Sequence, residues 1–227
     1  MSAPPCLILF DVDGTLVDSQ GAIVAAMTAA FAGLGLDVPA RAAILSIVGL
    51  SLDHAMARLA PDLPRTRQAE LVAGYKHAYN AQGQADGAAR GSPLYPGALQ
   101  MLEQLNAAPG TLLGVATGKS QRGLRALLAA HGLERMFVTT QVADHHPSKP
   151  HPSMILTAMA ETGVAPEQTV MIGDTSYDMD MARAANVAGI GVSWGYHGRA
   201  QLSAARQVID GFDALPACLN EIWKTTA

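Results

Sequence analysis

The sequence is poor in several residue types, and each shortage argues against a class of protein. Only two cysteines, Cys6 and Cys218, occur in 227 residues, so we expect packing residues in a reducing compartment rather than a disulfide framework, and a cytoplasmic protein. The formal charge of -4 comes without a stripe of basic residues, which argues against nucleic acid as a partner. The longest weakly apolar stretch, residues 22–36, is too short to span a bilayer, which argues against a membrane partner. No basic stretch precedes the first apolar run and Asp11 interrupts that run, so we expect no signal peptide.

Lysine is also scarce, so the position of each one is informative. Lys76, Lys119, Lys149 and Lys224 are the only four in the chain. Two of them, Lys119 and Lys149, fall in predicted loops that also carry other candidate functional residues. The sequence gives no indication of the oligomeric state.

The pattern of apolar residues changes along the chain. An apolar run at residues 6–10 predicts a buried strand, whereas residues 21–84 show helical patterning only. From residue 92 onward strands alternate with helices, which predicts an α/β fold with a Rossmann-like parallel sheet covered on both faces. We expect the later strands at residues 112–116, 136–140, 169–172, 188–192 and 207–209.

The helical block after the first strand is predicted to be an inserted all-helical cap domain. We place this cap at residues 18–91 and the α/β core at residues 1–17 and 92–227. The glycine-containing stretch at 87–93 is the expected return hinge.

Two carboxylates follow the first strand directly, in the segment Asp11-Val12-Asp13-Gly14-Thr15. Ligands gather at the carboxyl ends of strands in such sheets. Two ionised carboxylates about 5 Å apart repel by roughly 3 kcal/mol, so the pair needs a proton, a cation or both. A proton on Asp13 leaves Asp11 free as a nucleophile, and Mg²⁺ would neutralise the rest and favour a phosphate substrate. The alternative is an acidic turn that merely ends a strand.

Two further loops offer groups that could bind a phosphoryl group. Thr117 and Gly118 follow the second core strand and supply a hydroxyl and a backbone N–H, although Thr117 could instead cap a helix. The segment 114–120 imitates a Walker A loop, but leucine occupies position 113, where that loop needs glycine. Lys149 lies between prolines, where a buried ammonium could neutralise Asp11 and the phosphoryl group. A zinc site is an alternative for the nearby histidines His145, His146 and His151. Their spacing does not match a regular pattern of zinc ligands.

Carboxylates again follow a strand in the segment 172–178, at the start of a helix. Asp174 or Thr175 alone would satisfy the helix cap. Asp178, one turn later, exceeds what a cap needs, so we expect it to serve the site. Asp180 should point elsewhere.

Four such loops, each after a strand and in a fixed order, resemble the haloacid dehalogenase superfamily of phosphohydrolases. The segment DVDGTLVDS is similar to its first motif, Thr117 to its second, Lys149 to its third and GDTSYD to its fourth. The resemblance implies that Asp11 attacks phosphorus to give an aspartyl phosphate, while Asp13 protonates the leaving oxygen and later activates water.

The resemblance also implies roles for the other motif residues. Thr117 and the Gly118 amide would hold the phosphoryl group, and Lys149 would stabilise it. A Mg²⁺ cofactor would be bound by Asp11, by the backbone carbonyl of Asp13 and by Asp174, with Asp178 ordering the metal shell.

Within the superfamily, Asp13 favours a phosphate ester as substrate, because dehalogenases and phosphonatases lack an acid at this position. Sugar phosphomutases carry a cap sequence like KGxSR, whereas this chain reads Val48-Gly49-Leu50-Ser51-Leu52 without either basic residue. A phosphoglycolate phosphatase-like hydrolase acting on a small-molecule phosphate ester is therefore favoured. A β-phosphoglucomutase-like mutase and a non-catalytic binding module are the alternatives. By the family pattern, Ser51 is a candidate for substrate binding.

Overall fold

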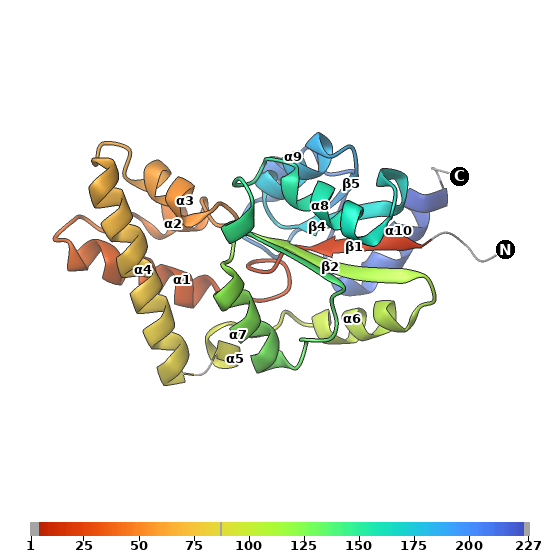
Figure 1. Ribbon diagram of the computed structural model, residues 1–227, viewed down its shortest axis with the longest axis horizontal. Coiled ribbons are helices and arrows are strands. Elements are labelled where there is room, and N and C mark those ends of the chain that lie inside the picture. The colour runs from red at the N-terminus through yellow and green to blue at the C-terminus, as the bar shows by residue number, and fades with distance from the viewer. Residues whose placement is uncertain (1–4, 87, 225–227) are drawn as a thin grey trace.

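The computed structural model describes residues 5–86 and 88–224, and within them six parallel strands form one sheet (Figure 1). The strand order is β3-β2-β1-β4-β5-β6. The predicted α/β fold with a Rossmann-like sheet is confirmed. The strands are β1 (Cys6–Phe10), β2 (Thr111–Thr117), β3 (Thr139–Val142), β4 (Thr169–Gly173), β5 (Ala188–Val192) and β6 (Gln207–Ile209).

Both faces of the sheet are buried, as the apolar strand β1 requires. Alternate side chains of a strand point to opposite faces, so Ile8 and Phe10 pack into one core and Leu7 and Leu9 into another. The first core is completed by α6 (Ala98–Ala107), α7 (Gln121–His131) and α10 (Leu215–Lys224). The second is completed by α8 (Ser153–Thr162) and α9 (Ser176–Ala184).

The residues between β1 and β2 form helices before the chain returns to the sheet. In Figure 1 the first four of these helices lie to one side of the sheet. They enclose a core of their own, which includes Met27, Phe31, Ile44, Met56 and Leu71. We call α1 (Gln20–Gly33), α2 (Arg41–Leu45), α3 (Leu52–Leu59) and α4 (Arg65–Asp86), with the loops between them, the helical segment. The short helix α5 (Ala88–Gly91) leads from it back toward the sheet.

The structure refines several of the expected elements. The third strand begins at Thr139 rather than at 136, because Met136 and Phe137 pack against the core from the loop and pairing with β2 starts at Thr139. The expected return hinge holds the short helix α5, and Gly87 lies outside the described residues. The division into a core at 1–17 and 92–227 and a cap at 18–91 stays a prediction.

None of the described helices is long and apolar enough to cross a membrane. Short 3-10 helices link some of the larger elements. The 3-10 helices are η1 (Ala143–His145), η2 (Pro166–Gln168), η3 (Arg199–Leu202) and η4 (Phe212–Ala214).

The core under the sheet should tolerate truncation poorly. Leu102 of α6 is 0% exposed, whereas Leu99 of the same helix is 39% exposed. Leu102→Ala should lower the free energy of unfolding by about 2–5 kcal/mol, because it leaves a cavity. The matched control Leu99→Ala should change it by about 0.5 kcal/mol or less. Urea denaturation of both variants measures the difference, and equal losses would contradict the assigned packing.

Candidate active site

Three neighbouring strands bring the sequence-predicted residues to one edge of the sheet. Asp11 follows β1, Thr117 ends β2 and Asp174 follows β4. Because β1 pairs with β2 on one side and with β4 on the other, their carboxyl ends lie together. The backbone N–H of Asp11 donates to the carbonyl of Ile172 over 2.9 Å, so the pairing with β4 continues into the site.

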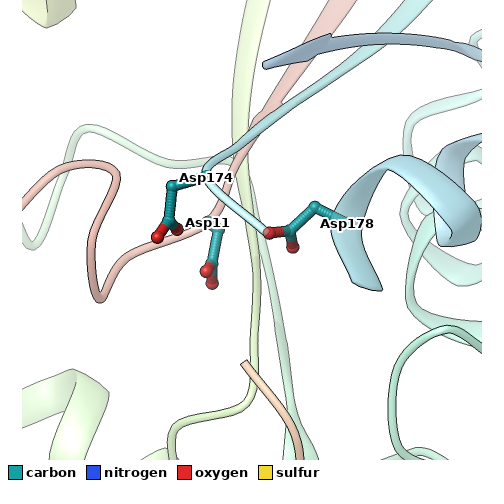
Figure 2. Close-up of side chains that lie close together, drawn as sticks. All are labelled: Asp11, Asp174 and Asp178. Carbon is teal, nitrogen blue, oxygen red and sulfur yellow. The ribbon is translucent and has the colours of Figure 1, made fainter. Parts of the chain in front are cut away.

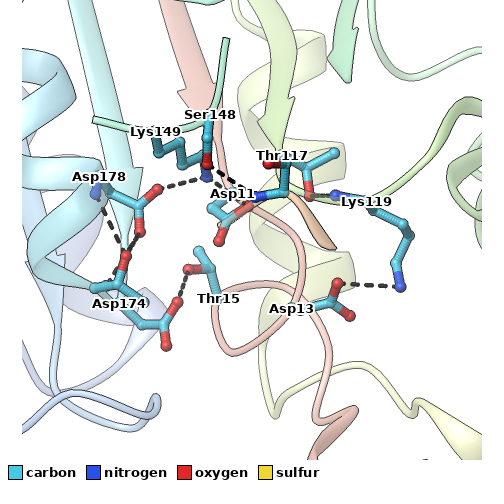
Figure 3. Close-up of polar contacts among 11 residues, drawn as sticks. Asp11, Asp13, Thr15, Thr117, Lys119, Ser148, Lys149, Asp174 and Asp178 are labelled. Carbon is cyan, nitrogen blue, oxygen red and sulfur yellow. Dashed lines mark hydrogen bonds and ion pairs between the residues drawn. The ribbon is translucent and has the colours of Figure 1, made fainter. Parts of the chain in front are cut away.

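Asp11 and Lys149 form a buried ion pair at the centre of this edge (Figure 3). The side chain of Lys149 lies 2.9 Å from Asp11 Oδ1 and donates to Asp178 Oδ1 over 2.6 Å. Asp11 is 1% exposed, and neither of its carboxylate oxygens accepts a hydrogen bond of regular geometry from the described residues. Lys149 therefore contacts only Oδ1 of Asp11, and Oδ2 can still accept a hydrogen bond or bind a cation.

Burial governs the charges of this pair. Loss of solvent raises the pKa of Asp11 to about 7, against the opposing attraction of Lys149. Burial by itself would lower the pKa of Lys149, but the charges of Asp11 and Asp178 hold that pKa above its ordinary value. Lys149 is therefore charged at neutral pH, as its predicted role requires.

Asp174 is fully buried and held from two sides. Thr15 Oγ1 donates to its Oδ1 over 3.1 Å, and the backbone N–H of Tyr196 donates to its Oδ2 over 2.8 Å. Burial, reinforced by the charges of Asp11 and Asp178, raises the pKa of Asp174 well above its ordinary value. Gly14 has a φ of +89°, and a Cβ at this position would overlap the carboxylate of Asp174. Glycine therefore allows both the turn and the approach of Asp174.

Asp178 serves the start of α9 as well as the site. Its Oδ2 accepts from the backbone N–H and from Oγ1 of Thr175, at 3.0 and 2.6 Å, as part of a capping box. The cap therefore uses Asp178 as well as Thr175, whereas the sequence suggested that Asp174 or Thr175 alone would satisfy it. Its other oxygen holds Lys149, so one carboxylate couples the helix to the ion pair.

Three carboxylates make up a candidate cation site (Figure 2). Asp11, Asp174 and Asp178 each offer an oxygen, and these oxygens lie within 4.8 Å of one another. Lys149 is the only ammonium paired with them among the described residues, which leaves excess negative charge. The cluster of buried carboxylate oxygens, with Oδ2 of Asp11 lacking a donor among the described residues, fits a hard cation such as Mg²⁺, which prefers oxygen ligands. The carboxylate of Asp13 is not in this group, and its carbonyl stays a predicted ligand.

Asp13 instead has partners that sequence reasoning missed. Lys119 Nζ lies 3.0 Å from its Oδ2, and Ser19 Oγ donates to its Oδ1 over 2.6 Å. The Ser19 hydroxyl is also 3.0 Å from the hydroxyl of Tyr196. Burial alone would lower the pKa of Lys119, but the charge of Asp13 holds it above its ordinary value. Two features of the sequence pointed to a role for Lys119 in the site: lysine is scarce in the chain, and Lys119 lies two residues after Thr117.

The loop after β2 forms the other side of the site. Thr117 is buried, and its Oγ1 accepts from the backbone N–H of Lys119 over 3.2 Å. Thr117 does not cap the following helix, because Ser120 does so by accepting from the N–H of Gly123. A Cβ on Gly118 would lie only 2.6 Å from the carbonyl oxygen of Gly49. The helical segment therefore rests directly on the Thr117–Gly118 loop.

A cavity of about 320 Å³ lies over these residues, and Asp11, Asp13, Thr117 and Gly118 line it. Ser51 does not belong to its lining, although the residues on both sides of it do. Its hydroxyl lies 3.0 Å from His54 Nδ1, and its backbone N–H donates to Ser148 Oγ over 2.9 Å. Ser51 thus connects the helical segment to the residue before Lys149.

The histidine alternative gains no support from the positions of the side chains. His146 lies between Ser153 Oγ and Gln141 Oε1, each 2.8 Å from a ring nitrogen. Neither it nor His145 and His151 joins a group that could hold a metal among residues 5–86 and 88–224.

Comparisons with known proteins agree with this geometry. Residues 8–192 match the model of the family described as haloacid dehalogenase-like hydrolase. The chain is 36% identical to a probable phosphatase, IndB, of Dickeya dadantii, over 97% of this chain and 96% of that protein. It is 32% identical to a phosphoglycolate phosphatase of Nitrosococcus oceani, over 87% of this chain and 88% of that protein.

A solved structure shares the fold over nearly its whole length. A haloacid dehalogenase-like family hydrolase from Streptococcus pneumoniae superposes with a TM-score of 0.80 at 27% identity, covering 94% of this chain and 98% of that one. The family match, the relatives and the shared fold agree with the four motifs on the sheet edge. The chain therefore belongs to the haloacid dehalogenase-like hydrolase family.

Proposed function

We propose that this protein is a Mg²⁺-dependent phosphatase that hydrolyses a small-molecule phosphate monoester through an aspartyl phosphate on Asp11. The observation that carries the proposal is the state of Asp11: a buried carboxylate that faces a cavity, with the Lys149 ammonium 2.9 Å from its Oδ1 and no donor to its Oδ2 among the described residues. A nucleophile needs such a free lone pair. The names of the relatives, a probable phosphatase and a phosphoglycolate phosphatase, support the same class of reaction.

The chain's own residues divide the work. An oxygen of Asp11 attacks phosphorus, while the Thr117 hydroxyl, the Gly118 amide and Lys149 hold the phosphoryl oxygens. Asp13 gives a proton to the leaving oxygen and then takes one from the attacking water. When bound at Asp11, Asp174 and Asp178, Mg²⁺ would supply positive charge beside the phosphoryl group.

Hydrolysis is proposed rather than phosphoryl transfer between sugar hydroxyls. The loop at 48–52 supplies no basic side chain, and Val48, Leu50 and Leu52 line the cavity. A second phosphate on a sugar would find no cation in this loop. A non-catalytic binding module would not need Asp13 fixed by Ser19 and Lys119 at the edge of the cavity. The cytoplasmic location stays a prediction.

Removal of the metal tests the cation site. Chelation with EDTA should abolish hydrolysis of p-nitrophenyl phosphate and Mg²⁺ should restore it, because the carboxylate cluster repels a phosphate dianion. Asp174→Asn should raise the Mg²⁺ concentration needed for half-maximal activity by about tenfold or more. Asp180→Asn is the matched control, since Asp180 pairs with exposed Arg183 at 2.9 Å. Full activity after exhaustive chelation, or identical Mg²⁺ titrations for Asp174→Asn and the control, would contradict the assignment.

The role of Asp13 is tested by the leaving group. Asp13→Asn should slow hydrolysis of aliphatic phosphate esters by about 10²–10⁴-fold, because a poor alkoxide leaving group needs the proton. The first turnover of p-nitrophenyl phosphate should suffer much less, and a burst of p-nitrophenol should precede a slow steady rate. Stopped-flow absorbance measures the burst. Asp18→Asn, in the same loop, is the control and should retain both rates. Equal slowing of both ester classes without a burst would remove Asp13 as the acid and base.

A further inference from the structure

Outside the motif residues, the lining of the cavity has a polar part, which includes Lys76, Asn80, Ser120, Arg122 and Asp144, and an apolar part contributed by the helical segment. The motif residues Asp11, Asp13 and Thr117 line the floor of the cavity. Above them lies what we call the apolar roof, contributed by α1, by the loop between α2 and α3, and by the start of α3. The apolar roof consists of Ile23, Met27, Ile47, Val48, Leu50 and Leu52.

Cations in the cavity are few and are not placed in the apolar roof. Lys119 is committed to Asp13 at 3.0 Å and to the hydroxyl of Tyr79 at 3.2 Å. The two other cationic residues of the described lining, Lys76 and Arg122, have exposed side chains. A carboxylate held against the apolar roof would therefore meet hydrocarbon. Each sugar hydroxyl held against the apolar roof would also lose its hydrogen bonds to water without gaining a partner, which weakens binding.

Two tyrosines of α4 add a flat surface to the same cavity. The rings of Tyr75 and Tyr79 stack with centroids 5.8 Å apart and an interplanar angle of 26°. The ammonium of Lys119 lies 4.9 Å from the centroid of the Tyr79 ring and fixes its position. Burial raises the pKa of the Tyr75 hydroxyl, in keeping with a dry surrounding. Aromatic faces of this kind pack best against other planar groups.

The available space exceeds what a two-carbon leaving group needs. The cavity measures about 320 Å³, within the size range of pockets that enclose ring-sized ligands. A second cavity, of about 690 Å³, shares Tyr79, Asn80, Lys119, Arg122 and Gly123 with the first, and Asp11 is not part of its lining. No acidic residue belongs to the described lining of this second cavity. A ring placed under the apolar roof could thus carry a further substituent.

We propose that the substrate is a phosphate monoester whose leaving group is flat, uncharged and mostly apolar, bound between the apolar roof and the tyrosine pair. This inference rests on the proposed phosphatase function and names the substrate class of that site. A leaving group of this kind removes hydrocarbon of the apolar roof from water when it binds, whereas a short carboxylate or a polyol does not.

The test compares esters of similar intrinsic reactivity, so that chemistry does not imitate binding. Benzyl phosphate, 2-naphthylmethyl phosphate, glycerol 1-phosphate and phosphoglycolate all release an alkyl alcohol. We expect kcat/KM for the two arylmethyl esters to exceed that of the other two by about tenfold or more. A higher kcat/KM for phosphoglycolate or glycerol phosphate would overturn the inference and leave the phosphatase function standing. Failure to hydrolyse any of the esters would overturn the proposed function, and the inference with it.

A pair of variants on α3 locates the effect. Leu52 and Leu59 are both half-buried and both pack on the core of the helical segment, but only Leu52 lines the cavity. Leu52→Gln should raise KM for 2-naphthylmethyl phosphate about fivefold or more, with less than about a twofold change for phosphoglycolate. Leu59→Gln, the matched control, should leave both KM values unchanged. Equal effects of the two variants on the aryl ester would contradict the inference.

Binding without turnover provides a second readout that does not depend on catalysis. In calorimetry with Mg²⁺ present, 2-naphthylmethylphosphonate should bind the wild-type protein about tenfold more tightly than phosphonoacetate does. Leu52→Gln should reduce that preference, and circular dichroism establishes that the variant is folded. Tighter binding of phosphonoacetate would overturn the inference.

Discussion

Lys149 places one buried ammonium between the carboxylates of Asp11 and Asp178, at 2.9 and 2.6 Å. Removing one partner from a buried ion pair costs about 3–5 kcal/mol, because the other charge is left without water or a counter-ion. Here three carboxylates are buried close together, and the one ammonium paired with them among the described residues contacts only two. The proposals that the site takes a cation and that Asp11 is the nucleophile rest on this imbalance.

The fold holds the three carboxylates in place because each follows a strand directly or belongs to a helix. Asp11 and Asp174 extend strands that are paired with each other, and Asp178 is fixed in the first turn of α9 by its bonds to Thr175. The helical segment completes the site from above, where the carbonyl of Gly49 lies against Gly118 with no room for a side chain. The candidate reacting groups thus lie at the sheet edge, whereas residues of the helical segment shape much of the cavity over them.

The sequence predicted the residues that follow strands, because a buried apolar run and the polar residue after it are both visible in one dimension. Asp11, Thr117 and Asp174 could be predicted in this way, and they lie at the ends of neighbouring strands. The contact of Ser19 with Tyr196 joins residues 177 positions apart and has no local signal. The cap of α7 was assigned to Thr117 as an alternative, whereas Ser120 forms it. The sequence predicts the start of the third strand at 136 instead of Thr139, because the apolar character of Met136 and Phe137 reflects packing against the core rather than strand pairing.

The central claim is that Asp11 becomes phosphorylated, and covalent labelling tests it most directly. Wild-type protein and Asp13→Asn are mixed with Mg²⁺ and an ester carrying a radiolabelled phosphoryl group, quenched in acid within one turnover, and digested for peptide mapping. The account predicts label on the peptide that contains Asp11, with more of it in Asp13→Asn, whose intermediate lacks its base for water attack. Label on another residue, or its absence from both proteins while product forms, would contradict the account.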